Sequence, residues 1–136
     1  MANGAYILAD ASDGQPEVIL LATGSEVHLA LEARDELEAE GIATRVVSMP
    51  CWELFDRQPP EYRELVLPWR VKARVAVEQG STLGWDRYVG GQGAVVGMHT
   101  FGASAPLKQL LTKFGFTPEG VAEVARERLA GADPAR

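Results

Sequence analysis

The chain has 136 residues, of which 46% are hydrophobic and 24% charged, the balance of a soluble globular domain large enough to bury a core. Its formal net charge of −6 argues against nucleic acid or an anionic membrane as a partner, because both are bound through excess Lys and Arg. The chain has no membrane-spanning apolar run, no signal-peptide pattern and only one cysteine, Cys51, so we expect a cytoplasmic protein without an internal disulfide.

Four short apolar runs predict strands that are covered on both faces, as in a parallel sheet. They span residues 18–22, 45–49, 74–77 and 94–98. An earlier strand is predicted at 5–11, joined to the run 18–22 by the short polar segment SDGQP. Such a connection permits an antiparallel neighbour but not a parallel one, which needs a dozen or more residues. We therefore expect a mixed five-stranded sheet whose first strand is antiparallel.

Three helical patterns separate the later strands. The first begins with Ser25, a helix-capping residue type, and ends at Gly41. The second follows Pro59 and ends before Pro68, and the third is a short segment within residues 83–91. Their apolar residues are, in chain order, Val27, Ala30, Leu31 and Leu37, then Tyr62, Leu65 and Val66, then Trp85, Tyr88 and Val89.

Two more helices are predicted at the end of the chain. Leucines and a phenylalanine at i, i+3, i+4 and i+7 favour a helix within residues 105–115. The last helix is capped by Thr117, has Pro118 at its first position and runs to about Leu129. The regular alternation of strands and helices predicts an α/β domain with helices on both faces of the sheet. We expect one domain over residues 1–131 and a disordered tail at 132–136.

The turn TGSE, between the run 18–22 and its helix, is the first candidate for a binding site. Thr23, Gly24 and Ser25 lie at a helix N-terminus, where free N–H groups and the helix dipole favour an anion. No lysine follows as in a P-loop, no further glycine follows as in a dinucleotide fingerprint, and Glu26 places a carboxylate in the same field. We expect the turn to be structural and keep an anion site as the alternative.

The carboxyl ends of the strands are the second candidate, because ligands of open α/β sheets bind there. Glu78 and His99 could form an acid/base pair if their strands are neighbours, although no nucleophile motif accompanies them. Cys51 is expected to be a structural thiol, since Glu53 and Asp56 oppose the lowered pKa that a reactive thiol needs. The histidines and the cysteine show no metal-ligand spacing. We predict no catalytic, cofactor-binding or metal-ligating residue, and we keep Glu78 and His99 as candidate residues of a crevice or an interface.

Several segments of the chain match a known family in order and spacing. They are ILLATGSEVHLALEA, RVVSMPCWELFDRQ, YRELVLP, ARVAVEQG, and VVGMHTFGASAP followed by FGFT. With these segments the chain resembles the C-terminal domain of transketolases, which belong to the thiamine diphosphate-dependent enzymes. The resemblance covers residues 4–129 and is most specific at 97–106 and at FGFT, 114–117.

The resemblance implies a three-layer α/β/α sandwich whose mixed sheet has an antiparallel first strand. Transketolases are homodimers of the pentose phosphate pathway that transfer a two-carbon ketol unit from a ketose phosphate to an aldose phosphate, using thiamine diphosphate and a divalent metal (Mg or Ca). In that family the cofactor and its activating glutamate are held by the first and middle domains. The implied partners are therefore the N-terminal and middle domains of the same enzyme and a second subunit.

A complete transketolase is several times longer than this chain, so we expect an excised or separately encoded domain that is inactive alone. Its implied role is to support the fold and subunit assembly, with Trp52, Trp69, Trp85 and His99 as candidates for contacts. One alternative is the C-terminal domain of a related enzyme, 1-deoxyxylulose-phosphate synthase or the 2-oxoacid dehydrogenase β chain; FGASAP with FGFT favours transketolase. The other is a small-anion or nucleotide-binding regulatory module that uses the TGSE turn.

Overall fold

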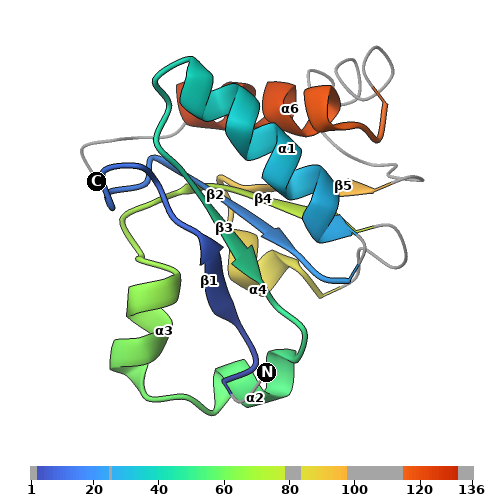
Figure 1. Ribbon diagram of the computed structural model, residues 1–136. Helices are drawn as coiled ribbons and strands as arrows, with labels where there is room; N and C mark the ends of the chain where they lie inside the picture. The colour runs from blue at the N-terminus through green and yellow to red at the C-terminus, as the bar shows by residue number, and fades with distance from the viewer. Residues whose placement is uncertain (1–2, 25, 79–83, 98–114, 132–136) are drawn as a thin grey trace.

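A mixed sheet lies between two layers of helices in the computed structural model, which describes residues 3–24, 26–78, 84–97 and 115–131 (Figure 1). Its strands are β1 (Tyr6–Ala9), β2 (Val18–Ala22), β3 (Thr44–Ser48), β4 (Ala73–Glu78) and β5 (Ala94–Gly97). They are ordered β1-β3-β2-β4-β5; the four later strands are parallel, and β1 is antiparallel to β3. The predicted mixed five-stranded sheet with an antiparallel first strand is confirmed.

The neighbour of β1 differs from the prediction. The short connection suggested a pairing with β2, but Tyr6 pairs with Ser48 of β3, which lies between β1 and β2. All five positions of β3 are buried, so this strand gains more from a place inside the sheet than from an edge. The connection 10–17 crosses the intervening strand easily, because neighbouring strands lie only about 4.8 Å apart.

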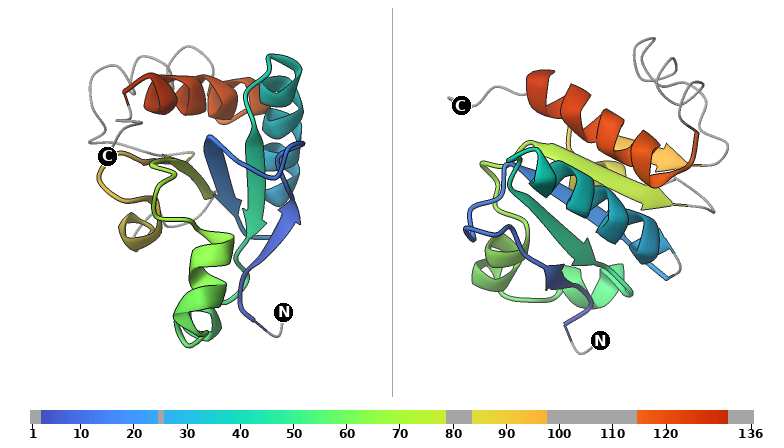
Figure 2. Two further views of the ribbon diagram at one scale, coloured as in Figure 1. Left: turned by 90° about the vertical axis from the view of Figure 1, so that its left-hand side faces the viewer. Right: turned by 45° about the horizontal axis from the view of Figure 1, so that its top comes forward.

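The two faces of the sheet carry separate apolar cores. One face packs Leu20 and Val46 against α1 (Glu26–Ala39) and α6 (Pro118–Gly131). The opposite face packs Ile19, Leu21 and Val47 against three short helices. These are α2 (Trp52–Asp56), α3 (Pro60–Val66) and α4 (Asp86–Val89). Figure 2 shows α1 and α6 side by side on their face, so the expected three-layer sandwich is confirmed.

The helix ends follow the predicted signals where the structure describes them. After α1, Gly41 takes a φ of +83° and the Ile42 N–H donates to Leu37 O at 3.0 Å, which ends the helix. At α6, the Gly120 N–H donates to Thr117 Oγ1 at 3.1 Å, so the predicted cap is confirmed. The helix α2 was not predicted, because its five residues are too few for a helical period.

Three predictions fall outside the described residues: Ser25 as a cap, the helix within 105–115, and the tail at 132–136. His99 lies outside them as well. Among the helices that are described, none is both long and apolar enough to cross a membrane.

Candidate functional site

The turn between β2 and α1 brings a carboxylate to the predicted anion site. Gly24 has a φ of +55°, and the N–H groups of Glu26 and Val27 donate to Thr23 O and Gly24 O at 3.2 and 3.3 Å. Glu26 is 8% exposed, and a Cβ on Gly24 would lie 3.8 Å from its Oε2. A bound anion would therefore lie close to the Glu26 carboxylate. Ser25, the third residue of the predicted anion site, lies outside the described residues. The anion site at Thr23, Gly24 and Ser25 stays a prediction.

At the carboxyl end of β4, Glu78 accepts a hydrogen bond from Trp85 Nε1 at 3.0 Å. Trp85 is fully buried and packs edge-on against Trp52, with ring centroids 4.8 Å apart. Glu78 thus satisfies the indole N–H of a core tryptophan. The pairing of Glu78 with His99 stays a prediction, because the structure does not describe His99.

The three tryptophans that were interface candidates lie in different environments. Trp52 and Trp85 pack in the core beside α2, α3 and α4. Trp69 is 63% exposed, with Lys72 Nζ 5.1 Å from its ring centroid. Of the three, Trp69 alone retains the exposed apolar surface that an interface residue needs.

A metal site would need oxygen, nitrogen or sulfur ligands that converge. Within the described ranges, no group of three or more His, Cys, Asp or Glu side chains is placed to hold a metal ion. The described residues therefore offer no such ligand set for a metal ion, and we assign no chemical step to one. Cys51 is free and half-buried, with its N–H donating to Gly4 O at 2.9 Å.

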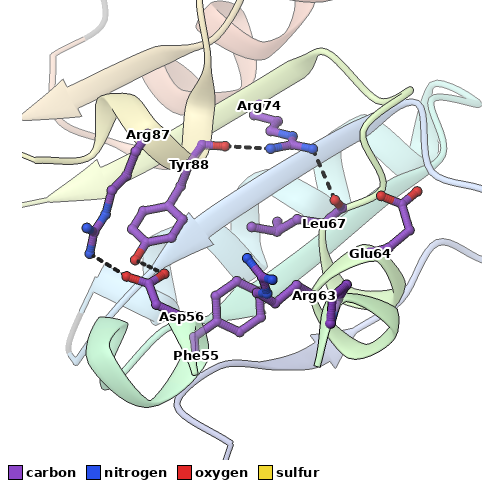
Figure 3. A pocket seen from close by; sticks show the side chains of 9 residues that line it. Phe55, Asp56, Arg63, Glu64, Leu67, Arg74, Arg87 and Tyr88 are labelled. Carbon is purple, nitrogen blue, oxygen red and sulfur yellow. Dashed lines mark hydrogen bonds and ion pairs between the residues drawn. The ribbon is translucent and has the colours of Figure 1, made fainter. Parts of the chain in front are cut away.

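The structure contains a pocket that the sequence did not reveal (Figure 3). It lies between α2, α3 and α4, on the face of the sheet that these three helices cover. It has a volume of about 380 Å³, with Phe55, Pro60 and Leu67 as apolar walls. Its charged and phenolic groups are Asp56, Arg63, Glu64, Arg74, Arg87 and Tyr88. We call it the arginine pocket. Its three arginines are 11 and 13 residues apart, a spacing that belongs to no local motif, so only the fold brings them together.

Arg74 enters the arginine pocket from β4 and is held by main-chain groups alone. Its guanidinium donates four hydrogen bonds of 2.7–3.2 Å and makes no ion pair with any described residue. The accepting carbonyls belong to Leu67, Pro68, Val71 and Tyr88. Burial lowers the pKa of Arg74, against the charge of Glu64, yet a guanidinium stays protonated at neutral pH. Arg74 thus brings a fixed positive charge that is not in direct contact with any carboxylate of the described residues.

On one side of the arginine pocket, Asp56 is already engaged. Arg87 Nη2 lies 3.0 Å from Asp56 Oδ2, and the Tyr88 hydroxyl donates to Asp56 Oδ1 at 2.9 Å. Burial, and then the bond and charge of Asp56, raise the pKa of Tyr88 to about 12, so its phenol is neutral at physiological pH. The Arg87 guanidinium also lies over the Tyr88 ring, 4.8 Å from the centroid.

Comparison with known families gives one match that covers most of the chain. The family model of the transketolase-like TK C-terminal domain matches residues 4–117. Transketolase 2 of Vibrio vulnificus (strain CMCP6) is 55% identical over 130 residues, which are 96% of this chain and 20% of that protein. The chloroplastic transketolase of Solanum tuberosum is 50% identical over 127 residues, 93% of this chain and 17% of that protein. The chain thus spans about a fifth of the length of these relatives.

Solved structures agree with the sequence comparison. The transketolase from Leishmania mexicana superposes with a TM-score of 0.78 at 44% identity, covering 99% of this chain and 19% of that one. A split gene transketolase, an inactive β4 tetramer, superposes with a TM-score of 0.65 at 28% identity, covering 96% of this chain and 43% of that one. These matches favour transketolase over the related thiamine enzymes and over an independent anion-binding module. The chain belongs to the transketolase C-terminal domain family.

Proposed function

We propose that this chain works as the C-terminal domain of a transketolase that moves a two-carbon ketol unit from a ketose phosphate to an aldose phosphate. The observation that carries the proposal is 55% identity to a transketolase over 96% of the chain. The whole enzyme would use thiamine diphosphate and a divalent metal, which its other domains would hold. We infer that the enzyme acts in the pentose phosphate pathway and in the cytoplasm; one relative, from Solanum tuberosum, is named chloroplastic.

The chain itself contributes structure and assembly contacts, as a single domain over residues 1–131, and no catalytic group. Glu78 and Asp56, two acids near the carboxyl ends of the strands, are bonded to Trp85, Tyr88 and Arg87, so both serve the packing of α4. Its partners are the N-terminal and middle domains of the same enzyme and a second subunit. A split gene transketolase solved as an inactive β4 tetramer, in which this chain covers 43% of one chain, supports inactivity without those parts.

A domain exchange tests the proposal. The matching segment of Vibrio vulnificus transketolase 2 is replaced by this chain, and ketol transfer is measured with thiamine diphosphate and Mg²⁺. We expect the hybrid to form dimers and to keep a kcat/KM within about tenfold of the parent enzyme, because every reacting group stays in the parent's own domains.

The isolated chain provides the control. Under the same conditions we expect no turnover from it. Turnover by the isolated chain would disprove the assignment of a purely structural role. A hybrid that folds and dimerises yet has lost activity by orders of magnitude would show that this chain does not serve as a transketolase domain.

A further inference from the structure

We propose that the arginine pocket binds a small phosphorylated molecule with an apolar or ring-shaped body, through Arg63 and the charge of Arg74. The site is distinct from the TGSE turn, and the proposal does not depend on the proposed function. It rests on charge balance, on the engagement of the acidic groups and on the apolar walls of the pocket.

The charge balance of the arginine pocket favours an anion. Three guanidinium groups face two carboxylates in its lining, so one positive charge is in excess, although the whole chain has a net charge of −6. Every buried side-chain N or O among the described residues has a hydrogen-bond partner, Arg74 included. Arg74 is therefore satisfied in hydrogen bonds by neutral carbonyls, and the lining as a whole keeps one positive charge more than its carboxylates offset, which attracts an anion.

The two acids of the pocket supply only part of the counter-charge, since the charge of Glu64 acts on Arg74 without a direct ion pair. Asp56 is paired with Arg87 and accepts the Tyr88 hydroxyl. Glu64 accepts the N–H of Trp69 at 3.1 Å, at the exposed end of α3. Neither carboxylate forms an ion pair with Arg63 or Arg74.

Arg63 is the donor available to a ligand. Its Nε donates to Gln58 O at 3.1 Å, and its two terminal amino groups have no partner among the described residues. Figure 3 draws its guanidinium between Asp56 on one side and Glu64 on the other. A planar guanidinium with both amino groups available matches the geometry of a phosphate oxygen pair.

The size and walls of the pocket restrict the rest of the ligand. About 380 Å³ is several times the volume of one phosphate group and falls in the range of small-molecule sites. The Phe55, Pro60 and Leu67 side chains give it an apolar wall that a bare inorganic anion would leave uncovered. The chemistry is therefore that of a phosphate monoester on a hydrophobic or ring-shaped body.

The probes are phenyl phosphate, inorganic phosphate and phenol, titrated separately into the ¹⁵N-labelled 136-residue chain at constant ionic strength and followed by amide chemical shifts. We expect phenyl phosphate to shift amides of α2, α3 and α4 around the pocket, and to bind more tightly than either phosphate or phenol. Arg63→Gln should raise the dissociation constant of phenyl phosphate at least about tenfold. Arg63→Lys should raise it by less, because lysine keeps the positive charge but lacks the planar pair of N–H donors.

Arg57→Gln is the matched control, because Arg57 is an exposed arginine of the same region whose side chain does not line the pocket. It should leave the dissociation constant unchanged. The spectrum of each variant also reports whether it is folded. Shifts that avoid the pocket, or equal weakening by Arg57→Gln, would overturn the site. If phenol bound as tightly as phenyl phosphate, the pocket would not require an anionic group. If inorganic phosphate bound as tightly, the pocket would not require an apolar body.

Discussion

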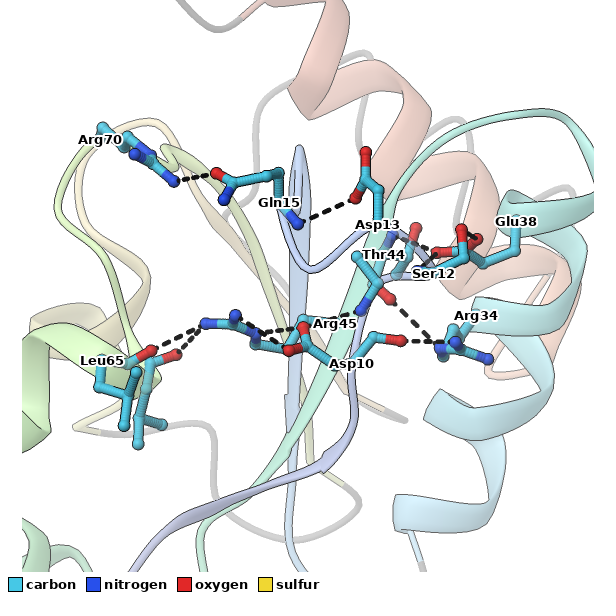
Figure 4. A network of polar contacts seen from close by, with 12 residues as sticks. Asp10, Ser12, Asp13, Gln15, Arg34, Glu38, Thr44, Arg45, Leu65 and Arg70 are labelled. Atoms are coloured by element: carbon cyan, nitrogen blue, oxygen red, sulfur yellow. Dashed lines mark hydrogen bonds and ion pairs between the residues drawn. The ribbon is translucent and has the colours of Figure 1, made fainter.

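Arg45 links three parts of the chain that are far apart in sequence (Figure 4). Its side chain is only 6% exposed, and its Nε donates to Asp10 Oδ1 at 2.7 Å. Its Nη1 donates to the carbonyls of Leu65 and Val66 at 2.9 and 3.2 Å. The end of β1, the middle of the sheet and the C-terminal end of α3 therefore depend on one guanidinium.

Replacing Arg45 by Met keeps the length of the side chain and removes its donors. We expect Arg45→Met to lower the free energy of unfolding by about 2–4 kcal/mol, because two main-chain acceptors and the Asp10 carboxylate lose a charged partner. Urea unfolding measures the loss. Arg70→Met, which removes an exposed arginine bonded to Gln15, should cost no more than about 0.5 kcal/mol. Equal losses would show that Arg45 is not a structural centre.

The same contact predicts a pH dependence of stability. Burial raises the pKa of Asp10, but the bonds from Arg45 and the Ala11 N–H, with the charges of Arg45 and Arg34, outweigh it and lower the pKa below its ordinary value. A carboxyl group with a lowered pKa stabilises the fold fully above its unfolded pKa of about 3.9, and this stabilisation disappears as the pH falls through the folded pKa.

We therefore expect the difference in unfolding free energy between the wild type and Asp10→Asn to be largest near neutral pH and to shrink below about pH 4. Urea unfolding at a series of pH values measures it. Asp35→Asn is the control, because the Asp35 side chain is 77% exposed and its carboxylate lies 3.6 Å from Arg34, too far for a hydrogen bond. A wild-type advantage that stays constant down to pH 2.5 would contradict a lowered pKa at Asp10.

At the scale of elements, the connection 10–17 is fixed to the end of α1 by a side chain that the sequence analysis did not single out. Glu38 accepts the Ser12 hydroxyl at 2.8 Å and the Thr44 N–H at 2.7 Å. Glu38 thereby connects the segment between β1 and β2, through Ser12, with Thr44, which is the first residue of β3. Sequence periodicity places Glu38 on the polar side of α1, and the contact arises only because β3 follows α1 back across the sheet.

Two glycines with similar backbone angles differ in their surroundings. Gly4 has a φ of +79°, and a Cβ there would lie 2.3 Å from both Cys51 O and Phe55 N, where β1 begins beside α2. Gly14 has a φ of +74°, and a Cβ there would meet nothing within 4 Å. The backbone penalty of a side chain is thus common to both positions, while the steric overlap exists at Gly4 alone.

We expect Gly14→Ala to cost about 1 kcal/mol, from its positive φ alone, and Gly4→Ala to cost about 2–5 kcal/mol, since α2 must also move. Thermal or urea unfolding distinguishes the two. Losses of the same size would mean that β1 and α2 are not in firm contact. Near-ultraviolet circular dichroism should change for Gly4→Ala only, because α2 carries Trp52 beside Trp85.

At the scale of the whole molecule, Trp69 and Leu65 are the most exposed large apolar side chains among the described residues, at 63% and 60%. Both lie around the C-terminal end of α3, where no described element covers them. An exposed tryptophan of this kind fits the surface through which a domain contacts the rest of its enzyme.

We expect Trp69→Ala to change the unfolding free energy of the isolated chain by less than about 0.5 kcal/mol, because the ring is mostly in solvent. In the hybrid transketolase, the same change should weaken assembly, measured as a higher dimer dissociation constant by sedimentation. Trp85→Ala serves as the contrast, because that ring is fully buried and its loss should destabilise the isolated chain by about 3–5 kcal/mol. Unchanged assembly would remove Trp69 from the interface.

Local patterns of the sequence determined most of the elements. The apolar runs of β2, β3, β4 and β5, the cap at Thr117 and the stop at Gly41 each depend on residues within one turn or one strand. The same local information predicted an α/β domain with helices on both faces. The family resemblance added the three-layer arrangement, since short motifs carry more specific information than periodicity.

The tertiary structure alone decided which elements are neighbours. The placement of β1 beside β3, the contacts of Arg45 with α3, and the meeting of Arg63, Arg74 and Arg87 in one pocket all join residues from separate elements. Such contacts depend on the order of strands in the sheet, which apolar periodicity does not encode because every buried strand has the same pattern. The sequence therefore determined the elements and the family, and the packing of the sheet determined where charges of the chain meet.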